Sequence, residues 1–312
     1  MHTPGRYRIL PAGAESTLHR RRPRRISELV NSAAFLDPAL PFGNAAPGGG
    51  HWRRLVSLGD SFTAGLGDPE PGSPGGIRGW ADRTAEELAA LRPDFSYANL
   101  AVSGLVLQEI VDLQLERAIA LRPDLVTLSA GGNDLVFHRR DPDRLADDLD
   151  AAVAALSATG ATVVIFTGPD WGHTPVFGRI RGKVAVFNEN IRTIAARHHG
   201  VIADLWTMRE LSDPRMWDPD RLHFSPLGHH TIAGMVLDTL QVPHSLVPLR
   251  PKPLPAPGWR QTRTEDLSWA THYLFPWMAQ RLRPHAPESP AAPKRPDPGP
   301  VLRVNVSPAG SP

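Results

Sequence analysis

Between residues 53 and 245, short hydrophobic runs alternate with longer amphipathic segments. The hydrophobic runs have the length and composition of buried strands and lie at 55–58, 97–102, 124–129, 162–167 and 201–205. The amphipathic segments have helical spacing and lie at 80–91, 105–121, 145–160, 181–199 and 226–240. No hairpin signal joins the runs, which indicates a mostly parallel sheet covered on both faces. We therefore predict an α/β fold, a three-layer α/β/α sandwich with a mostly parallel five-stranded sheet.

Proline content divides the chain into parts. About half of its 33 prolines lie after residue 242, where helices and central strands cannot propagate, because proline lacks a backbone N–H. We expect a basic, disordered N-terminal extension at 1–51, a folded domain at 52–245 and a Pro-rich basic tail at 246–312. Within that tail, hydrophobic spacing predicts a short amphipathic helix at about 266–283, which docks on the domain or meets a partner.

The net charge of +2 conceals two basic ends around an acidic centre, since Arg and Lys outnumber acids in both tails. An acidic domain argues against nucleic acid as its substrate. The Arg-rich run near residue 20 is interpreted as a solvated tail rather than a surface for acidic partners or lipid headgroups. The sequence identifies no protein partner for either tail.

The chain has no cysteine, which excludes disulfides, thiolate catalysis and Cys-based zinc sites and is typical of a reducing compartment. The basic run at 19–25 is not followed by the apolar stretch of a signal peptide. No segment reaches the ~18 apolar residues of a membrane-spanning helix. We expect a soluble cytoplasmic protein. The histidine pairs at 198–199 and 229–230 are interpreted as solvated residues, and no metal or other cofactor is expected.

Candidate chemistry follows the first three predicted strands. Ligands of open parallel sheets bind at the carboxyl ends of the strands, where loops and helix N-termini converge. Ser61 follows the first strand, Gly104 the second and Asn133 the third. These residues become neighbours if the three strands are adjacent. Asp60 and Asp134 lie beside them and are expected to bind loop backbone.

A serine hydroxyl is a nucleophile only when a base takes its proton and an acid orients that base. Asp220 and His223 offer such a pair before the last predicted helix, and their spacing lets the carboxylate turn back onto the imidazole. The backbone N–H groups of Ser61 and Gly104, with the Asn133 amide, could stabilise an oxyanion. The alternative reading makes Asp220 and His223 a helix cap, and Gly104 and Asn133 turn formers.

Four segments carry a family resemblance: GDS at 59–61, the turn at Gly104, GGND at 131–134 and DPDRLH at 218–223. In order and spacing they resemble the four sequence blocks of the SGNH (GDSL-type) hydrolases, over about residues 52 to 245. Phe62 departs from the name-giving pattern, which has Leu at that position.

This resemblance implies a flavodoxin-like α/β/α fold and ester or thioester hydrolysis through an acyl-enzyme. Carried over residue by residue, it makes Ser61 the nucleophile, Asp220 the orienting acid and His223 the base. Ser61, Gly104 and Asn133 become the oxyanion donors. The tail segment at 269–283 is similar to one that follows the domain in some actinobacterial members.

We therefore predict a serine esterase or lipase-like hydrolase that acts on a small-molecule ester. Two alternatives stay open: acyl transfer to a sugar or other alcohol through the same site, and a non-catalytic binding domain on the same fold. Some of the aromatic residues at element ends are expected to line the acyl or alcohol pocket: Trp80, Phe137, Trp171, Trp206 and Trp217.

Overall fold

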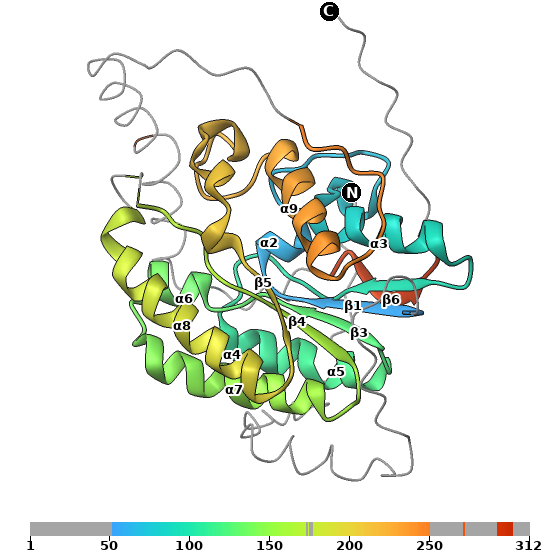
Figure 1. Cartoon of the computed structure of the whole chain (residues 1–312), viewed down its shortest axis with the longest axis horizontal. Coiled ribbons are helices and arrows are strands. Elements are labelled where there is room, and N and C mark those ends of the chain that lie inside the picture. The colour runs from blue at the N-terminus through green and yellow to red at the C-terminus, as the bar shows by residue number, and fades with distance from the viewer. Residues whose placement is uncertain (1–51, 173, 175–176, 250–270, 272–291, 302–312) are drawn as a thin grey trace, which may run out of the picture.

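The computed structural model describes residues 52–172, 174, 177–249, 271 and 292–301, and its centre is a six-stranded sheet. The order across the sheet is β5-β4-β3-β1-β2-β6 (Figure 1). The strands are β1 (Arg54–Leu58), β2 (Ser96–Asn99), β3 (Leu125–Leu128), β4 (Thr162–Phe166), β5 (Val201–Ala203) and β6 (Arg295–Gly299). The first five are parallel, so the predicted mostly parallel sheet is confirmed, although it has one strand more than predicted.

Helices cover both faces of the sheet (Figure 1). On one face, α3 (Gly79–Leu91) packs against α9 (Pro226–Thr239). The other face carries α4 (Leu107–Ile110), the π-helical turn η2 (Val111–Leu115), α5 (Glu116–Ala120), α7 (Pro142–Ser157) and α8 (Arg181–Arg197). Two short helices, α2 (Ser61–Ala64) and α6 (Gly132–Phe137), begin just after β1 and β3.

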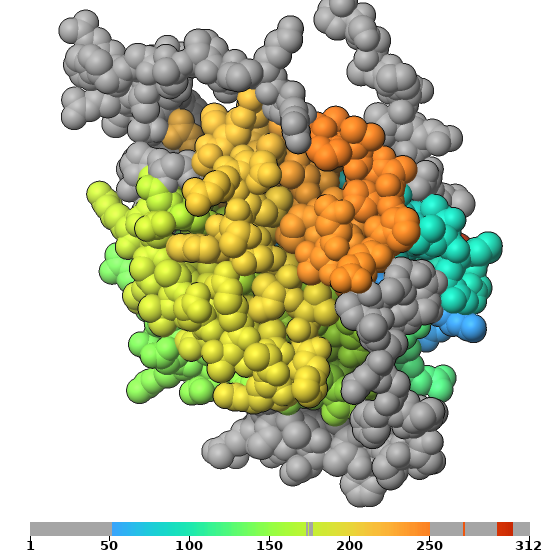
Figure 2. Space-filling model, in the orientation of Figure 1, coloured from blue at the N-terminus to red at the C-terminus, as the bar shows by residue number. Residues whose placement is uncertain are grey.

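Single 3-10 turns complete the connections: η1 (Pro74–Gly76), η3 (Phe177–Ile180), η4 (Leu205–Thr207), η5 (Arg209–Ser212) and η6 (Pro214–Met216). Three of them lie between β5 and α9. Figure 2 shows this connection and α9 forming one unbroken stretch of surface, coloured from yellow to orange. Among the described residues, no helix has the length and hydrophobicity needed to cross a membrane.

The core explains why the central strands read as continuous hydrophobic runs. Both faces of a parallel sheet are covered, so side chains on both sides of β1 and β3 are buried. Helix ends follow local signals. The Ser225 side chain accepts a hydrogen bond from the backbone N–H of Gly228, and Pro226 occupies the first helical position of α9. These two residues fix the start of α9 just after the loop that carries His223.

The sixth strand comes from the Pro-rich tail, where no strand was predicted. β6 pairs antiparallel with β2 at the edge of the sheet, with Tyr97 opposite Gly299 and Asn99 opposite Arg295. Its prolines occupy alternate positions of the sequence RPDPGP. Because successive N–H groups of a strand point to opposite sides, alternate prolines leave one side able to pair. Proline therefore excludes a central strand but permits this edge strand.

Lys294 anchors the segment that forms β6. Its side chain is 5% exposed, and its Nζ donates to the carbonyl oxygens of Ile77 and Arg78 at 3.2 and 2.6 Å. The same Nζ lies 2.9 Å from a carboxylate oxygen of Asp82, which is also buried. The tail is thereby tied to the start of α3. The predicted extension at 1–51 and, except for Thr271, the predicted helix at about 266–283 lie outside the described residues.

Candidate active site

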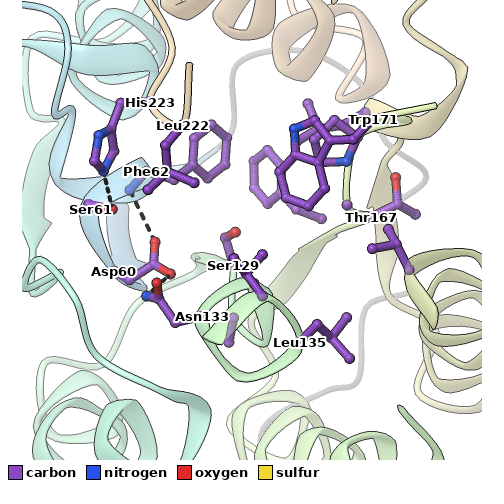
Figure 3. Close-up of a pocket in the computed structure, with 18 of the residues that line it drawn as sticks. Asp60, Ser61, Phe62, Ser129, Asn133, Leu135, Thr167, Trp171, Leu222 and His223 are labelled. Atoms are coloured by element: carbon purple, nitrogen blue, oxygen red, sulfur yellow. Dashed lines mark hydrogen bonds between the residues drawn. The ribbon is translucent and has the colours of Figure 1, made fainter. Parts of the chain in front are cut away.

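Ser61 is the first residue of α2, at the carboxyl end of the central strand β1. The chain leaves β1 through Gly59, whose φ is +153°. A Cβ at Gly59 would lie 2.4 Å from the hydroxyl oxygen of Thr63 and 2.8 Å from the carbonyl oxygen of Ser129, so only glycine fits. Asp60 then caps α2 by accepting a hydrogen bond from the Phe62 N–H at 3.0 Å. This turn presents the Ser61 side chain beside the cavity (Figure 3).

His223 links Ser61 to Asp220 (Figure 3 shows the Ser61 contact). Its Nε2 lies 3.0 Å from Ser61 Oγ, and its Nδ1 lies 2.5 Å from Asp220 Oδ2. The other carboxylate oxygen of Asp220 accepts hydrogen bonds from the backbone N–H groups of Leu222 and His223, each at 2.9 Å. The structure therefore brings together the three side chains predicted to form the triad.

The loop that carries His223 is closed by backbone contacts. Trp217 and Phe224 form an isolated antiparallel bridge, and the N–H of Asp218 donates to the carbonyl oxygen of His223 at 2.8 Å. Gly67 packs directly on this loop, since a Cβ there would lie 2.1 Å from the Phe224 carbonyl oxygen. The position of the imidazole is therefore fixed by the backbone as well as by Asp220.

The carboxyl groups of Asp220 and Asp60 have pKa values shifted in opposite directions. Burial alone would raise the pKa of Asp220, but its hydrogen bond to His223 and the imidazole charge outweigh burial and lower that pKa. Burial raises the pKa of Asp60 to about 6, although the Phe62 N–H and the charge of His223 act against the rise. Asp220 is consequently the ionised partner of the imidazole, whereas Asp60 changes charge close to neutral pH.

Asn133 joins three strand-end segments. Its Nδ2 donates to Asp60 Oδ2 and to the carbonyl oxygen of Leu105, both at 2.9 Å. Both N–H groups of the amide are thus engaged, and one must be released or shared if Asn133 is to bind an oxyanion. Gly104 precedes Leu105 in this turn and has a left-handed φ of +85°. It does not line the pocket beside Ser61.

The neighbouring acid Asp134 has a structural role, as predicted. Its Oδ2 accepts a hydrogen bond from the backbone N–H of Leu107 at 2.9 Å, which holds the start of α4 against α6. Burial raises the pKa of Asp134 despite that hydrogen bond. Asp60 also binds loop backbone, but its contact with Asn133 brings it closer to the reacting groups than predicted.

A pocket of about 110 Å³ opens beside Ser61 and His223 (Figure 3). Of the five aromatic residues predicted to line it, Phe137, Trp171 and Trp217 do so. Trp80 is fully buried behind the pocket, where its ring contacts Phe62 and Phe166. The other apolar lining side chains include Leu135, Val136, Val184, Phe187, Leu205, Leu222 and Phe224.

Two further sequence interpretations concern Trp206 and His229. Trp206 lies outside the pocket, with its ring centre 5.4 Å from the Arg181 guanidinium carbon.

The interpretation of His229 as a solvated residue is wrong, because its side chain is completely buried. Its Nδ1 accepts a hydrogen bond from the Trp80 N–H at 3.1 Å, and its Nε2 bonds the Leu66 carbonyl oxygen at 3.0 Å. Within the described ranges, no group of three His or acidic residues could hold a metal ion.

Sequence reasoning missed two amides that brace the site. Gln114 binds the backbone of Gly59, and Asn188 binds both the N–H and the carbonyl oxygen of Gly168 in the pocket wall. Both residues are at most 2% exposed. Their only signal in the sequence is a polar residue on the hydrophobic face of a predicted helix, between positions such as Val111 and Leu115.

Comparison with known proteins adds a family and a set of similar folds. The family model described as GDSL-like Lipase/Acylhydrolase matches residues 57–231. TesA is 22% identical with a TM-score of 0.50, and the match covers 61% of this chain and 98% of TesA. LAE5, an α/β hydrolase from the metagenome of Lake Arreo, Spain, is 22% identical with a TM-score of 0.51, covering 62% of this chain and 97% of LAE5.

A third solved structure is Axe2, an acetylxylan esterase from Geobacillus stearothermophilus, which is 19% identical with a TM-score of 0.50. That match covers 62% of this chain and 96% of Axe2. No curated protein sequence matches the chain significantly. The three solved structures share the fold of the sheet and the helices that cover it. The family match spans every segment that contributes to the site.

Proposed function

The chain belongs to the GDSL-like lipase/acylhydrolase family and is an ester-hydrolysing enzyme, and from this premise we propose that it cleaves carboxylic esters through an acyl intermediate on Ser61. The observation that carries the proposal is the continuous hydrogen-bonded chain from Asp220 through His223 to Ser61. A helix cap or a turn former would not require His223 to reach a hydroxyl 162 positions away.

In the first step, Ser61 Oγ attacks the ester carbonyl carbon while His223 Nε2 takes the hydroxyl proton. Asp220 holds the imidazole in the tautomer that leaves Nε2 free to accept, and its charge stabilises the imidazolium. The imidazolium then protonates the leaving alcohol oxygen as the C–O bond breaks. Water attacks the acyl-Ser61 ester in the second step, with His223 as base, and releases the carboxylic acid.

The oxyanion formed in each step needs hydrogen-bond donors. The backbone N–H groups of Ser61 and Gly104 form no hydrogen bond with other described residues, so neither is engaged by that part of the chain. Asn133 supplies a third donor when one of its N–H groups turns from Asp60 or Leu105 to the substrate oxygen. Removing one such donor typically costs about 3 kcal/mol in activation free energy.

Hydrolysis of p-nitrophenyl acetate and butyrate by the wild type and Ser61→Ala tests the nucleophile. We expect the variant to lose at least about a thousandfold in kcat, and labelling by a fluorophosphonate probe to disappear in Ser61→Ala and His223→Ala. Ser212→Ala, at an exposed hydroxyl that does not line the cavity, is the control and should behave as wild type. Equal activity of wild type and Ser61→Ala would refute the assignment, and product analysis with an added alcohol separates hydrolysis from acyl transfer.

A further inference from the structure

Among the described residues, the indole N–H of Trp171 in the pocket wall has no hydrogen-bond partner. Trp171 is 8% exposed, and its indole Nε1 is buried without a hydrogen bond. Two other donors of the same wall are engaged: Trp217 Nε1 donates to the Leu211 carbonyl oxygen at 2.7 Å, and Thr167 Oγ1 donates to Asp204 at 2.7 Å. Buried donors in proteins are nearly always paired, and the exceptions are enriched at functional sites.

The Trp171 ring belongs to a cluster of aromatic side chains beside the pocket. It packs against Phe177 and Trp217, with ring centroids 5.5 and 6.3 Å away. Figure 3 shows Trp171 on the opposite side of the cavity from Ser61 and His223, with Ser129 between them. The hydroxyl of Ser129 lines the pocket and, within the described part of the chain, forms no hydrogen bond.

The acyl part of the ester, rather than the alcohol, fits this side of the site. His223 protonates the leaving alcohol oxygen, so the alcohol must lie next to the imidazole. The acyl group then extends away from His223, past Ser129 and toward Trp171 (Figure 3). Along this path the walls are apolar, with Leu135, Val184 and Phe187 among them, and they suit methylene groups or a ring.

We propose that the enzyme selects acyl groups that carry an oxygen acceptor near their far end, and that Trp171 Nε1–H donates a hydrogen bond to that oxygen. Esters of oxo, alkoxy or hydroxy acids form the substrate class. The apolar walls bind the hydrocarbon stem, and Ser129 adds a second polar contact along it. This inference rests on the proposed function, because it assumes that the acyl group on Ser61 occupies the pocket.

Isosteric esters test the inference, since replacing one methylene by an ether oxygen adds only an acceptor. The substrates are p-nitrophenyl hexanoate, 4-methoxybutanoate and 3-ethoxypropanoate, which have equal chain lengths and differ in the position of the oxygen. We expect the wild type to prefer at least one ether over hexanoate by about tenfold in kcat/KM. In Trp171→Phe, which keeps an aromatic ring but has no N–H, the preference should fall to parity or reverse, because an unpaired oxygen is costly in an apolar pocket.

Trp217→Phe is the matched control, because the Trp217 N–H is already bonded to the protein, and it should retain the ether preference. Hexanoate hydrolysis by Trp171→Phe reports whether the variant is folded and competent. A direct binding measurement supports the kinetics: 4-methoxybutanoate should bind Ser61→Ala more tightly than hexanoate, and Trp171→Phe should abolish this difference. A wild type that hydrolyses hexanoate but favours neither ether, or a preference unchanged by Trp171→Phe, overturns the inference alone. Absence of hydrolysis of all three esters and of p-nitrophenyl acetate and butyrate overturns the proposed function as well.

Discussion

The side-chain amide of Gln114 forms two hydrogen bonds with the backbone of Gly59. Its Nε2 donates to the Gly59 carbonyl oxygen at 2.8 Å, and its Oε1 accepts from the Gly59 N–H at 2.9 Å. Gln114 lies in the π-helical turn η2, where one helix continues from α4 to α5 with a changed face. The Gln114 amide therefore bonds the Gly59 backbone as a neighbouring strand would, at the point where the chain leaves β1 and turns toward Ser61.

Replacing Gln114 should reduce turnover more than substrate binding. In Gln114→Leu the backbone of Gly59 loses two partners, and Ser61 loses part of its fixed orientation toward His223. We expect kcat to fall about tenfold to a hundredfold with KM changed less than about threefold, because small displacements of reacting groups are costly. The kcat of Gln114→Glu, which keeps only the acceptor, should lie between the kcat values of the wild type and of Gln114→Leu.

Gln108→Leu is the control for this change, because Gln108 lies on the adjoining helix α4 and its side-chain amide bonds Asp112 at the surface. Kinetics on p-nitrophenyl butyrate are measured alongside thermal unfolding. A folded Gln114→Leu variant with wild-type kcat would show that the hydrogen bonds between Gln114 and Gly59 do not orient Ser61.

Asp60→Asn should remove one ionisation from the pH–rate profile. Burial raises the pKa of Asp60 to about 6, so its carboxylate becomes negative as the pH rises through that value. The negative charge favours the imidazolium that His223 forms in the transition state. Asparagine carries no charge and keeps the oxygen that accepts from the Phe62 N–H, but its NH2 group takes the place of the oxygen that accepts from Asn133.

We therefore expect the wild-type to variant ratio of kcat to be near one below pH 5 and to rise about tenfold by pH 7.5. Initial rates between pH 4.5 and 8 provide the measurement. A ratio that is constant over this range would contradict a catalytic contribution from the Asp60 charge.

His229 should make the fold less stable in mild acid. Burial lowers its pKa from 6.5 to about 4, so between these values the unfolded chain binds a proton that the folded chain does not. The free energy of unfolding therefore decreases as the pH falls from about 6.5 to 4, by up to about 3 kcal/mol. Urea unfolding at a series of pH values measures this slope.

The slope in that pH window should diminish in His229→Gln, which cannot bind a proton. His199→Asn is the control, because His199 is exposed and its left-handed φ of +55° suits asparagine. An unchanged slope in His229→Gln would assign the acid sensitivity to other groups.

Lys294→Met should destabilise the domain even though it lies in the Pro-rich tail. The change leaves the buried carboxylate of Asp82 without its nearest cation, with Arg295 still 3.9 Å away, and removes the donor to two carbonyl groups. We expect a loss of about 3 kcal/mol in the free energy of unfolding, as for other buried ion pairs with one partner removed. Lys183→Met, at an exposed lysine that also binds two carbonyl oxygens, should cost less than about 1 kcal/mol.

A double variant distinguishes the ion pair from general damage. Adding Asp82→Asn to Lys294→Met removes the unpaired charge and should recover part of the lost stability. If the double variant is as unstable as the sum of the two single variants, the pairing of Lys294 with Asp82 contributes nothing.

The sequence alone determined the order of strands and helices along the chain, and the segments that follow each strand. These features are readable because burial of a strand on both faces, as in β1 and β3, leaves a continuous hydrophobic run. Ser61, Asp220 and His223 could be proposed as partners because their chemistry requires one another and each lies next to a predicted element end.

Only the tertiary structure decided which distant polar groups meet. The contacts of Gln114 with Gly59 and of Lys294 with Asp82 join elements that are separate in the sequence, and no local periodicity encodes them. Burial of His229 depends on α3 covering α9. The edge strand β6 forms because Lys294 is anchored beside it and its prolines alternate, whereas proline content by itself predicts no strand. Hydrophobic pattern records how each segment is buried, but the packing of segments determines which side chains face one another.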